Sequence, residues 1–97
     1  MSIIVSGTLR VAPSERDRYL AARRSVLEAA RRAPGCLDFS LSPDLLEADR
    51  INVHERWRSR EDLLDFRSSG GPEPDDGGIA LTGADVLLHH IASSEAP

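Results

Sequence analysis

The sequence predicts a small α+β domain in which a four-stranded antiparallel sheet carries helices on one face. Two kinds of hydrophobic periodicity follow one another along the 97 residues, one repeating every second residue and one every three to four. Turn signals rich in proline and glycine separate these segments. The resulting order is strand, helix, strand, strand, helix, strand. This βαββαβ order is the split βαβ pattern of ferredoxin-like folds.

The first half of the chain supplies one strand and one helix. Apolar and polar residues alternate over residues 3–11, which predicts a half-buried strand. Gly7 lies within it and indicates either a bulge or room for something that packs close. Pro13 opens a helix whose apolar residues follow helical spacing, while arginines occupy its opposite, solvated face. Pro34 and Gly35 end this single helix.

The second half supplies the other three strands. Residues 37–42 and 51–57 alternate in polarity and are joined by an acidic hairpin loop. Ser59 precedes an acidic residue by three positions, the pattern of a capping box, so a short helix begins there. Residues 68–78 are too rich in glycine, proline and aspartate for regular structure and predict an acidic loop, either a lid or a disordered segment. A last strand covers residues 84–91.

Composition limits the classes of function. The formal net charge is −4 and there is no concentrated basic surface, so we expect neither nucleic acid nor membrane as a partner. The single cysteine, Cys36, predicts a half-buried structural thiol and excludes an internal disulfide. The first residues do not read as a signal peptide, so we expect a cytoplasmic protein. Residues 1–92 are expected to form one domain and residues 93–97 a tail.

Two stretches carry a resemblance to a known family. Pro-Gly-Cys-Leu-Asp-Phe at residues 34–39 is followed by Val-His-Glu-Arg-Trp-Arg-Ser-Arg-Glu-Asp-Leu at residues 53–63. Together with the βαββαβ order, they resemble the antibiotic biosynthesis monooxygenase family. The resemblance implies a homodimer in which two sheets pack into a dimeric α+β barrel. It also implies a cleft between sheet and helices, in which some members oxidise aromatic polyketides or quinols without flavin or metal, while related members open the heme ring.

Two departures from the family refine what the resemblance implies. Phe66 stands where the heme-degrading relatives place a histidine ligand, and Gly7 stands where they have an asparagine. Heme is therefore disfavoured, and we expect no cofactor and no metal. The polyketide oxygenases place an asparagine at the position of Val53. Asn52 is one residue away and points to the opposite face of the strand.

Glu55 is the most informative residue that needs no family knowledge. It shares a strand face with apolar neighbours, and that face is expected to meet the helices. A carboxyl in such a place either pairs with an arginine or holds its proton with a raised pKa, as a general base near neutral pH requires. Trp57, two residues on, offers a flat wall for a planar ligand or an anchor for the core. Both alternatives remain open at this point.

The remaining candidates are titratable or aromatic. His54 and His89 are candidate bases or plain surface residues, and His90 points away from His89, so the histidines make a poor metal site. His89 is a candidate base only if its side chain lies on the helix-facing side of the sheet. The predicted substrate-binding residues are Trp57, Phe39, Phe66, Tyr19, Asn52 and Gly7.

These residues support two functional hypotheses. The first is a cofactor-independent monooxygenase, in which a base deprotonates a small phenolic or quinol-like aromatic and the anion reacts with dioxygen. The alternative is a dimeric module without oxygenase activity, which binds or isomerises a small molecule or serves as an accessory protein. The fold alone does not choose between them.

Overall fold

The computed structural model describes residues 2–69 and 77–97 of the chain. Most of the predicted acidic loop, residues 70–76, lies outside the described residues. In chain order the elements are β1 (Ile3–Arg10), the 3-10 helix η1 (Pro13–Glu15), α1 (Arg16–Ala22), α2 (Arg24–Arg32), β2 (Cys36–Pro43), β3 (Arg50–Trp57), α3 (Arg60–Ser68) and β4 (Gly83–His90).

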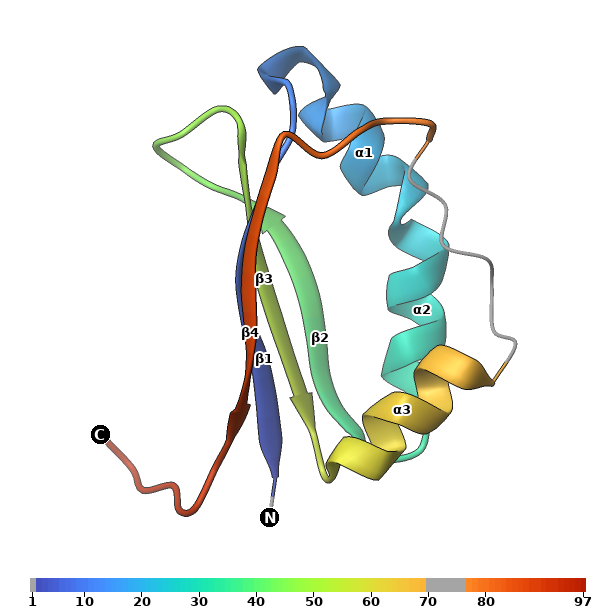
Figure 1. Cartoon of the computed structure of the whole chain (residues 1–97), viewed down its shortest axis with the longest axis vertical. Helices are drawn as coiled ribbons and strands as arrows, with labels where there is room; N and C mark the ends of the chain where they lie inside the picture. The colour runs from blue at the N-terminus through green and yellow to red at the C-terminus, as the bar shows by residue number, and fades with distance from the viewer. Residues whose placement is uncertain (1, 70–76) are drawn as a thin grey trace.

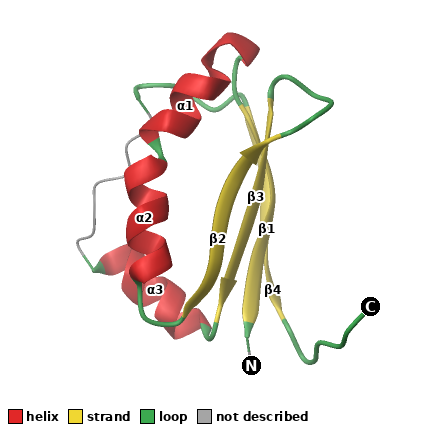
Figure 2. Ribbon diagram, turned by 180° about the vertical axis from the view of Figure 1, so that it is seen from behind, coloured by secondary structure: helices red, strands yellow, loops and turns green. Residues whose placement is uncertain are grey.

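The four strands form one antiparallel sheet in the order β2-β3-β1-β4. All of the α-helices lie on one side of this sheet, and the opposite face is open (Figure 1). The view from behind shows the same two layers (Figure 2). The predicted ferredoxin-like α+β fold is therefore confirmed.

The register confirms which residues share the helix-facing side. Glu55 lies between Val5 of β1 and Phe39 of β2, in one row across the sheet. Burial follows the same alternation along β3, where every second residue from Ile51 to Trp57 is buried. The period of two in the sequence was thus sufficient to assign the faces of this strand.

Strand β2 departs from the predicted alternation at its start. Cys36 pairs with Trp57 and Asp38 pairs with Arg56, so Leu37 is an extra residue in a β-bulge. Its side chain is 50 % exposed. The alternation predicted for residues 37–42 is therefore interrupted at Leu37, because the bulge adds one residue to β2.

The long helix predicted after Pro13 is divided at Arg23. This residue has φ −85° and ψ −2°, and its backbone N–H donates to the carbonyls of Tyr19 and Leu20. The chain therefore makes a turn between α1 and α2. Apolar residues keep their helical spacing across the turn, which is why the sequence predicted one continuous helix.

Two groups of apolar side chains fill the space between sheet and helices. One surrounds Trp57 at one end of the sheet, and the other surrounds Tyr19 at the opposite end. The members of the first are Ile3, Val5, Val26, Ala30, Phe39, Trp57 and Leu63. The members of the second are Val11, Tyr19, Ile51 and Ile79.

Ser59 begins α3 as predicted. Its Oγ accepts a hydrogen bond from the backbone N–H of Asp62, and it donates to the carboxylate of the same residue at 3.0 Å. This cap fixes the helix that carries Phe66 over the end of β3.

Candidate functional site

Glu55 is a carboxyl enclosed between the sheet and the helices. It is the one charged residue among the buried residues of the described chain, with 8 % of its surface exposed. Its Oε1 accepts a hydrogen bond from the indole Nε1–H of Trp57 at 3.0 Å. Its Oε2 receives no hydrogen bond from any described residue. One oxygen of the carboxyl is therefore held by the indole of Trp57.

Burial raises the pKa of Glu55, since desolvation disfavours the charged form. The Trp57 hydrogen bond opposes this shift, and so do the charges of Arg67, Arg23 and His54. Within residues 2–69 and 77–97, Glu55 makes no ion pair with an arginine. Of the two alternatives drawn from the sequence, the structure has the carboxyl with a raised pKa.

Aromatic rings pack around this carboxyl. The rings of Trp57 and Phe66 lie 5.5 Å apart at an interplanar angle of 32°. Phe39 meets Phe66 edge to face, with ring centroids 6.4 Å apart. Trp57 is 0 % exposed, so its ring anchors the core and orients Glu55. Phe66 is half-buried and reaches the surface of this cluster.

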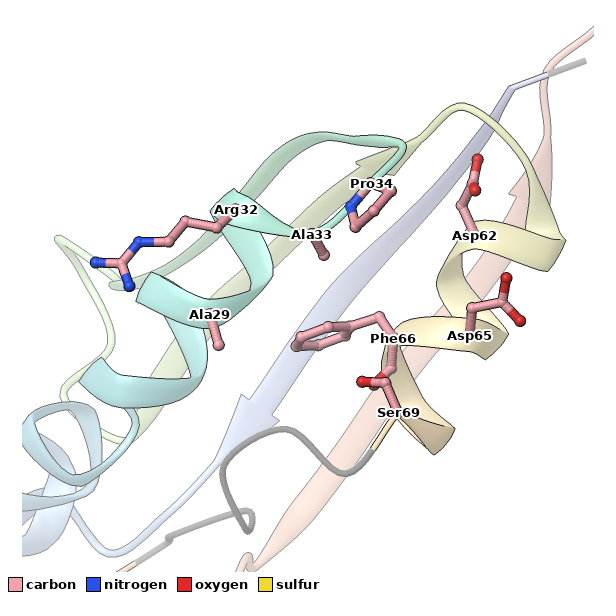
Figure 3. Close-up of a pocket in the computed structure, with 8 residues that line it drawn as sticks. All are labelled: Ala29, Arg32, Ala33, Pro34, Asp62, Asp65, Phe66 and Ser69. Carbon is pink, nitrogen blue, oxygen red and sulfur yellow. The ribbon is translucent and has the colours of Figure 1, made fainter.

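A pocket of about 380 Å³ opens on the other side of Phe66. It lies between the end of α2 and α3, and its lining consists of Ala29, Arg32, Ala33, Pro34, Asp62, Asp65, Phe66 and Ser69. Phe66 points from α3 toward Ala29, whereas Arg32 extends away from α3 (Figure 3). Among the predicted binding residues, Phe66 alone lines this pocket, and it separates the pocket from Trp57.

No free space remains beside Gly7, one of the predicted substrate-binding residues. A Cβ built on Gly7 would lie 1.9 Å from the backbone oxygen of Asp85 and 2.7 Å from the Cα of Val86. The backbone of β4 therefore occupies the position of the missing side chain. Gly7 also has φ +152°, which other residues rarely adopt. The predicted close approach at Gly7 is present, but the neighbour is the β4 backbone, so Gly7 leaves no room there for a substrate.

Three of the candidates lie on the open face of the sheet, away from Glu55. His54 pairs with Ser6 in the register and approaches Asp38, with Nε2 and Oδ2 3.6 Å apart. His89 pairs with Ile4 on that face, so the condition set for it as a candidate fails. Strand alternation separates both histidines from the enclosed carboxyl.

Asn52 also lies on the open face and is engaged by its neighbours. It accepts a hydrogen bond from Arg50 Nε at 2.8 Å and donates to Asp44 Oδ1 at 3.0 Å. The bond from Asn52 and two backbone N–H donors lower the pKa of Asp44 to about 2. Asn52 thus holds the base of the β2–β3 hairpin. Tyr19 is buried in the second apolar group and is not brought together with Trp57.

Arg23 is a residue that the sequence did not single out. The pattern placed it with the other arginines on a solvated helix face. Instead, its Nε is buried and has no hydrogen-bond partner in the described part of the chain. Its charge acts on Glu55 from the α1–α2 junction. No signal in the sequence marked the turn that places it there.

Two further observations concern possible metal ligands and the single thiol. Among the described residues, no three histidine, cysteine or acidic side chains gather as metal ligands. The pKa of Cys36 is raised by burial and then by the charges of Glu55 and Asp38, which disfavours a reactive thiolate. Among the same residues, no helix has the length and apolar character needed to cross a membrane.

Fold and site together define a small ferredoxin-like α+β domain with an enclosed acid beneath its helices. The antibiotic biosynthesis monooxygenase family model matches residues 2–71, most of the chain. The chain belongs to this family, as its sequence motifs predicted.

Other proteins resemble this chain in sequence or in fold. The chain is 31 % identical over 61 residues to an uncharacterized protein of Synechocystis sp., a match that covers 63 % of this chain and 42 % of that relative. It thus spans less than half of the length of this curated relative. A putative antibiotic biosynthesis monooxygenase from Nitrosomonas europaea has a similar structure, with a TM-score of 0.77, 13 % identity and coverage of 94 % and 89 % of the two chains. A heme-degrading protein from Mycobacterium tuberculosis has a similar structure with a TM-score of 0.69 and 18 % identity. The match covers 99 % of this chain and 100 % of that chain. These two structures support the fold alone.

Proposed function

We propose that this protein is a cofactor-independent monooxygenase that oxidises a small phenolic or quinol-like aromatic with dioxygen. The observation that carries the proposal is the state of Glu55. Its carboxyl is enclosed, its pKa is raised, and Trp57 holds one oxygen while the other has no partner among the described residues. A base with a raised pKa and a free oxygen is suited to take a proton from a weakly acidic substrate.

The reaction requires no electrons from outside the substrate. Glu55 takes the proton of the substrate hydroxyl, and the electron pair of the O–H bond stays on the aromatic anion. The anion then reacts with dioxygen at a ring carbon. One oxygen atom remains in the product, and the other leaves as water with two substrate hydrogens. The protein supplies a base, apolar walls such as Phe66 and Phe39, and shielding from bulk water.

The substrate would enter beside Phe66. This residue lines the pocket between α2 and α3 and contacts both Trp57 and Phe39. In this proposal, a change in the Phe66 side-chain rotamer opens a path from the pocket toward Glu55. The pocket volume of about 380 Å³ is within the usual range for small-molecule sites.

Homodimerisation through the open sheet face is part of the proposal. That face presents Leu87, which is 62 % exposed. The β2–β3 hairpin extends past the same side, away from the helices (Figures 1 and 2). It carries Leu45 and Leu46, which are 99 % and 95 % exposed. Burial of each leucine in an interface would contribute roughly 1.5–3 kcal/mol.

A second candidate is a small-molecule isomerase or binding module. The same base would move a proton between two carbon or oxygen atoms without dioxygen. Val53, in place of an oxygenase asparagine, favours this candidate, and so does the absence of an open face on Trp57.

Oxygen consumption tests the proposal. With anthrones and hydroquinones as substrates, the wild-type protein should consume one dioxygen per product. Glu55→Gln should slow turnover by roughly 10²–10⁴-fold, the usual contribution of a general base. The matched control is Glu61→Gln, which changes an exposed residue of α3 and should leave turnover intact. Full turnover in Glu55→Gln would refute the role of Glu55. Proton exchange without oxygen uptake would favour the isomerase.

A further inference from the structure

Strand β4 is an edge of the sheet with a row of outward backbone groups. Its neighbour in the sheet is β1, and it has no strand on its other side in the described chain. The Ile91 N–H donates to the Ser2 carbonyl at 2.9 Å, and this bond sets the phase of the ladder between β1 and β4. Alternate residues therefore direct their N–H and C=O groups away from the sheet, namely Ala84, Val86, Leu88 and His90. No hydrogen bond reaches these groups from residues 2–69 or 77–97.

The opposite edge of the sheet, at β2, is protected by the chain itself. Arg31 of α2 donates its Nε–H to the Phe39 carbonyl at 2.9 Å, and the bulge at Leu37 interrupts the strand. Such devices keep an edge from pairing with another chain. The register of β4 with β1 is unbroken, and β4 contains neither proline nor lysine. In Figure 1, β4 lies in front of β1, and no described helix or strand covers it.

The side chains of β4 complement a second copy of the same strand. Only outward groups can bond between the copies, so an antiparallel register changes in steps of two residues. In one register Leu87, which is 62 % exposed, faces Leu87 of the second copy. The carboxylate of Asp85 then faces the imidazole of His89, twice in each pair of copies, because the arrangement has two-fold symmetry. A shift by two residues in either direction loses the carboxylate–imidazole pair.

The same register also suits the helix-facing side. Val86 and Leu88 are half-buried and pack against the apolar group around Trp57. In the register centred on Leu87, Val86 of one copy faces Leu88 of the other. These two residues carry outward backbone groups, so such a pair exchanges two hydrogen bonds. Charge, apolar contact and backbone pairing thus favour one arrangement.

We propose that β4 pairs antiparallel with β4 of a second copy, with Leu87 on the two-fold axis, so that the two sheets become one. This contact goes beyond the proposed function and differs from the proposed open-face dimer. The two-fold axis stands perpendicular to the sheet, so both helix layers lie on the same side and both open faces stay free. The two contacts together build a tetramer.

Cysteine cross-linking tests the register directly. All variants carry Cys36→Ser, which removes the native thiol. In a non-hydrogen-bonded antiparallel pair the Cα atoms lie about 4.5 Å apart, within the range that a disulfide bridges. Leu87→Cys should therefore form a dimer on non-reducing gels when oxidised glutathione is added at micromolar protein concentration.

Asp85→Cys is the matched control, since this residue is also exposed on β4. Its counterpart in the second copy would lie more than about 10 Å away along the strands, so it should cross-link at least tenfold more slowly than Leu87→Cys. A mixture of Asp85→Cys and His89→Cys proteins should cross-link to each other. Sheets that stack face to face lie about 10 Å apart, so the open-face dimer does not produce these disulfides.

Sedimentation separates this inference from the open-face dimer. Asp85→Arg places like charges opposite His89 and should weaken the edge contact at least tenfold, while exchange of the two residues, Asp85→His with His89→Asp, should restore it. Replacing Leu45 and Leu46 with serine should leave the edge contact intact. If Leu87→Cys cross-links no faster than Asp85→Cys, or if Asp85→Arg leaves the assembly unchanged, the inference is wrong, whether or not the leucine variant loses the open-face dimer.

Discussion

The hydrogen bond between Trp57 and Glu55 should be measurable as a coupling free energy. Trp57→Phe removes the Nε1–H donor, which lies 3.0 Å from Glu55 Oε1. A hydrogen bond to a charged group contributes about 1.5–3 kcal/mol, and one to a neutral amide about 0.5–1.5 kcal/mol. At mildly alkaline pH the carboxyl is ionised. There, Trp57→Phe should lower the free energy of unfolding by about 1–2 kcal/mol more in the wild type than in the Glu55→Gln variant.

A double-mutant cycle gives this difference directly. The wild type, Trp57→Phe, Glu55→Gln and the double variant are unfolded in urea and followed by circular dichroism, which does not depend on the tryptophan. The loss of ring volume is common to both backgrounds and cancels. If Trp57→Phe lowers the free energy of unfolding by the same amount in both backgrounds, within about 0.5 kcal/mol, the indole does not hold the carboxylate.

Three further predictions concern the acid, the sheet and the open face. Because its folded-state pKa is raised, Glu55 contributes stability below the pKa of an unfolded glutamate, about 4.3, and this contribution is lost as pH rises through the folded pKa. Glu55→Gln should thus differ little from the wild type in acid and be more stable at neutral pH in urea unfolding, and a constant difference would contradict the raised pKa. Gly7→Ala should lower the free energy of unfolding by roughly 2–6 kcal/mol through overpacking and backbone strain. The control Gly83→Ala should be tolerated, because its Cβ would lie 3.4 Å from the nearest atom. Replacing both Leu45 and Leu46 with serine should weaken the dimer by roughly 100-fold or more in sedimentation, and a wild-type monomer at micromolar concentration would rule out the dimer.

The sequence predicted those features that depend on short-range patterns. Alternation along β3 assigned Glu55 and Trp57 to the helix-facing side, and the register bears this out. The spacing of Ser59 and Asp62 predicted the start of α3 correctly. Each of these signals lies within a few residues of the chain, where local geometry determines which side chains can meet.

The errors arose where a feature depends on a neighbouring element. The bulge at Leu37 follows from how β2 pairs with β3. The space beside Gly7 is occupied by the backbone of β4, about 80 residues further along the chain. The turn at Arg23 contains neither glycine nor proline, so the arginine pattern alone indicated a solvated side chain. Hence the burial of the Glu55 carboxyl was predictable, while the burial of Arg23 Nε was not.

The sheet order also sets when the protein can fold during its synthesis. β1 is a central strand, and its register with β4 brings Ile3 beside His90. One edge of β1 therefore stays unpaired until the ribosome has released nearly the whole domain. Such late, long-range pairing slows folding and leaves an open strand edge that can recruit other chains. Truncated variants that lack β4 should accordingly aggregate and not form a smaller folded unit.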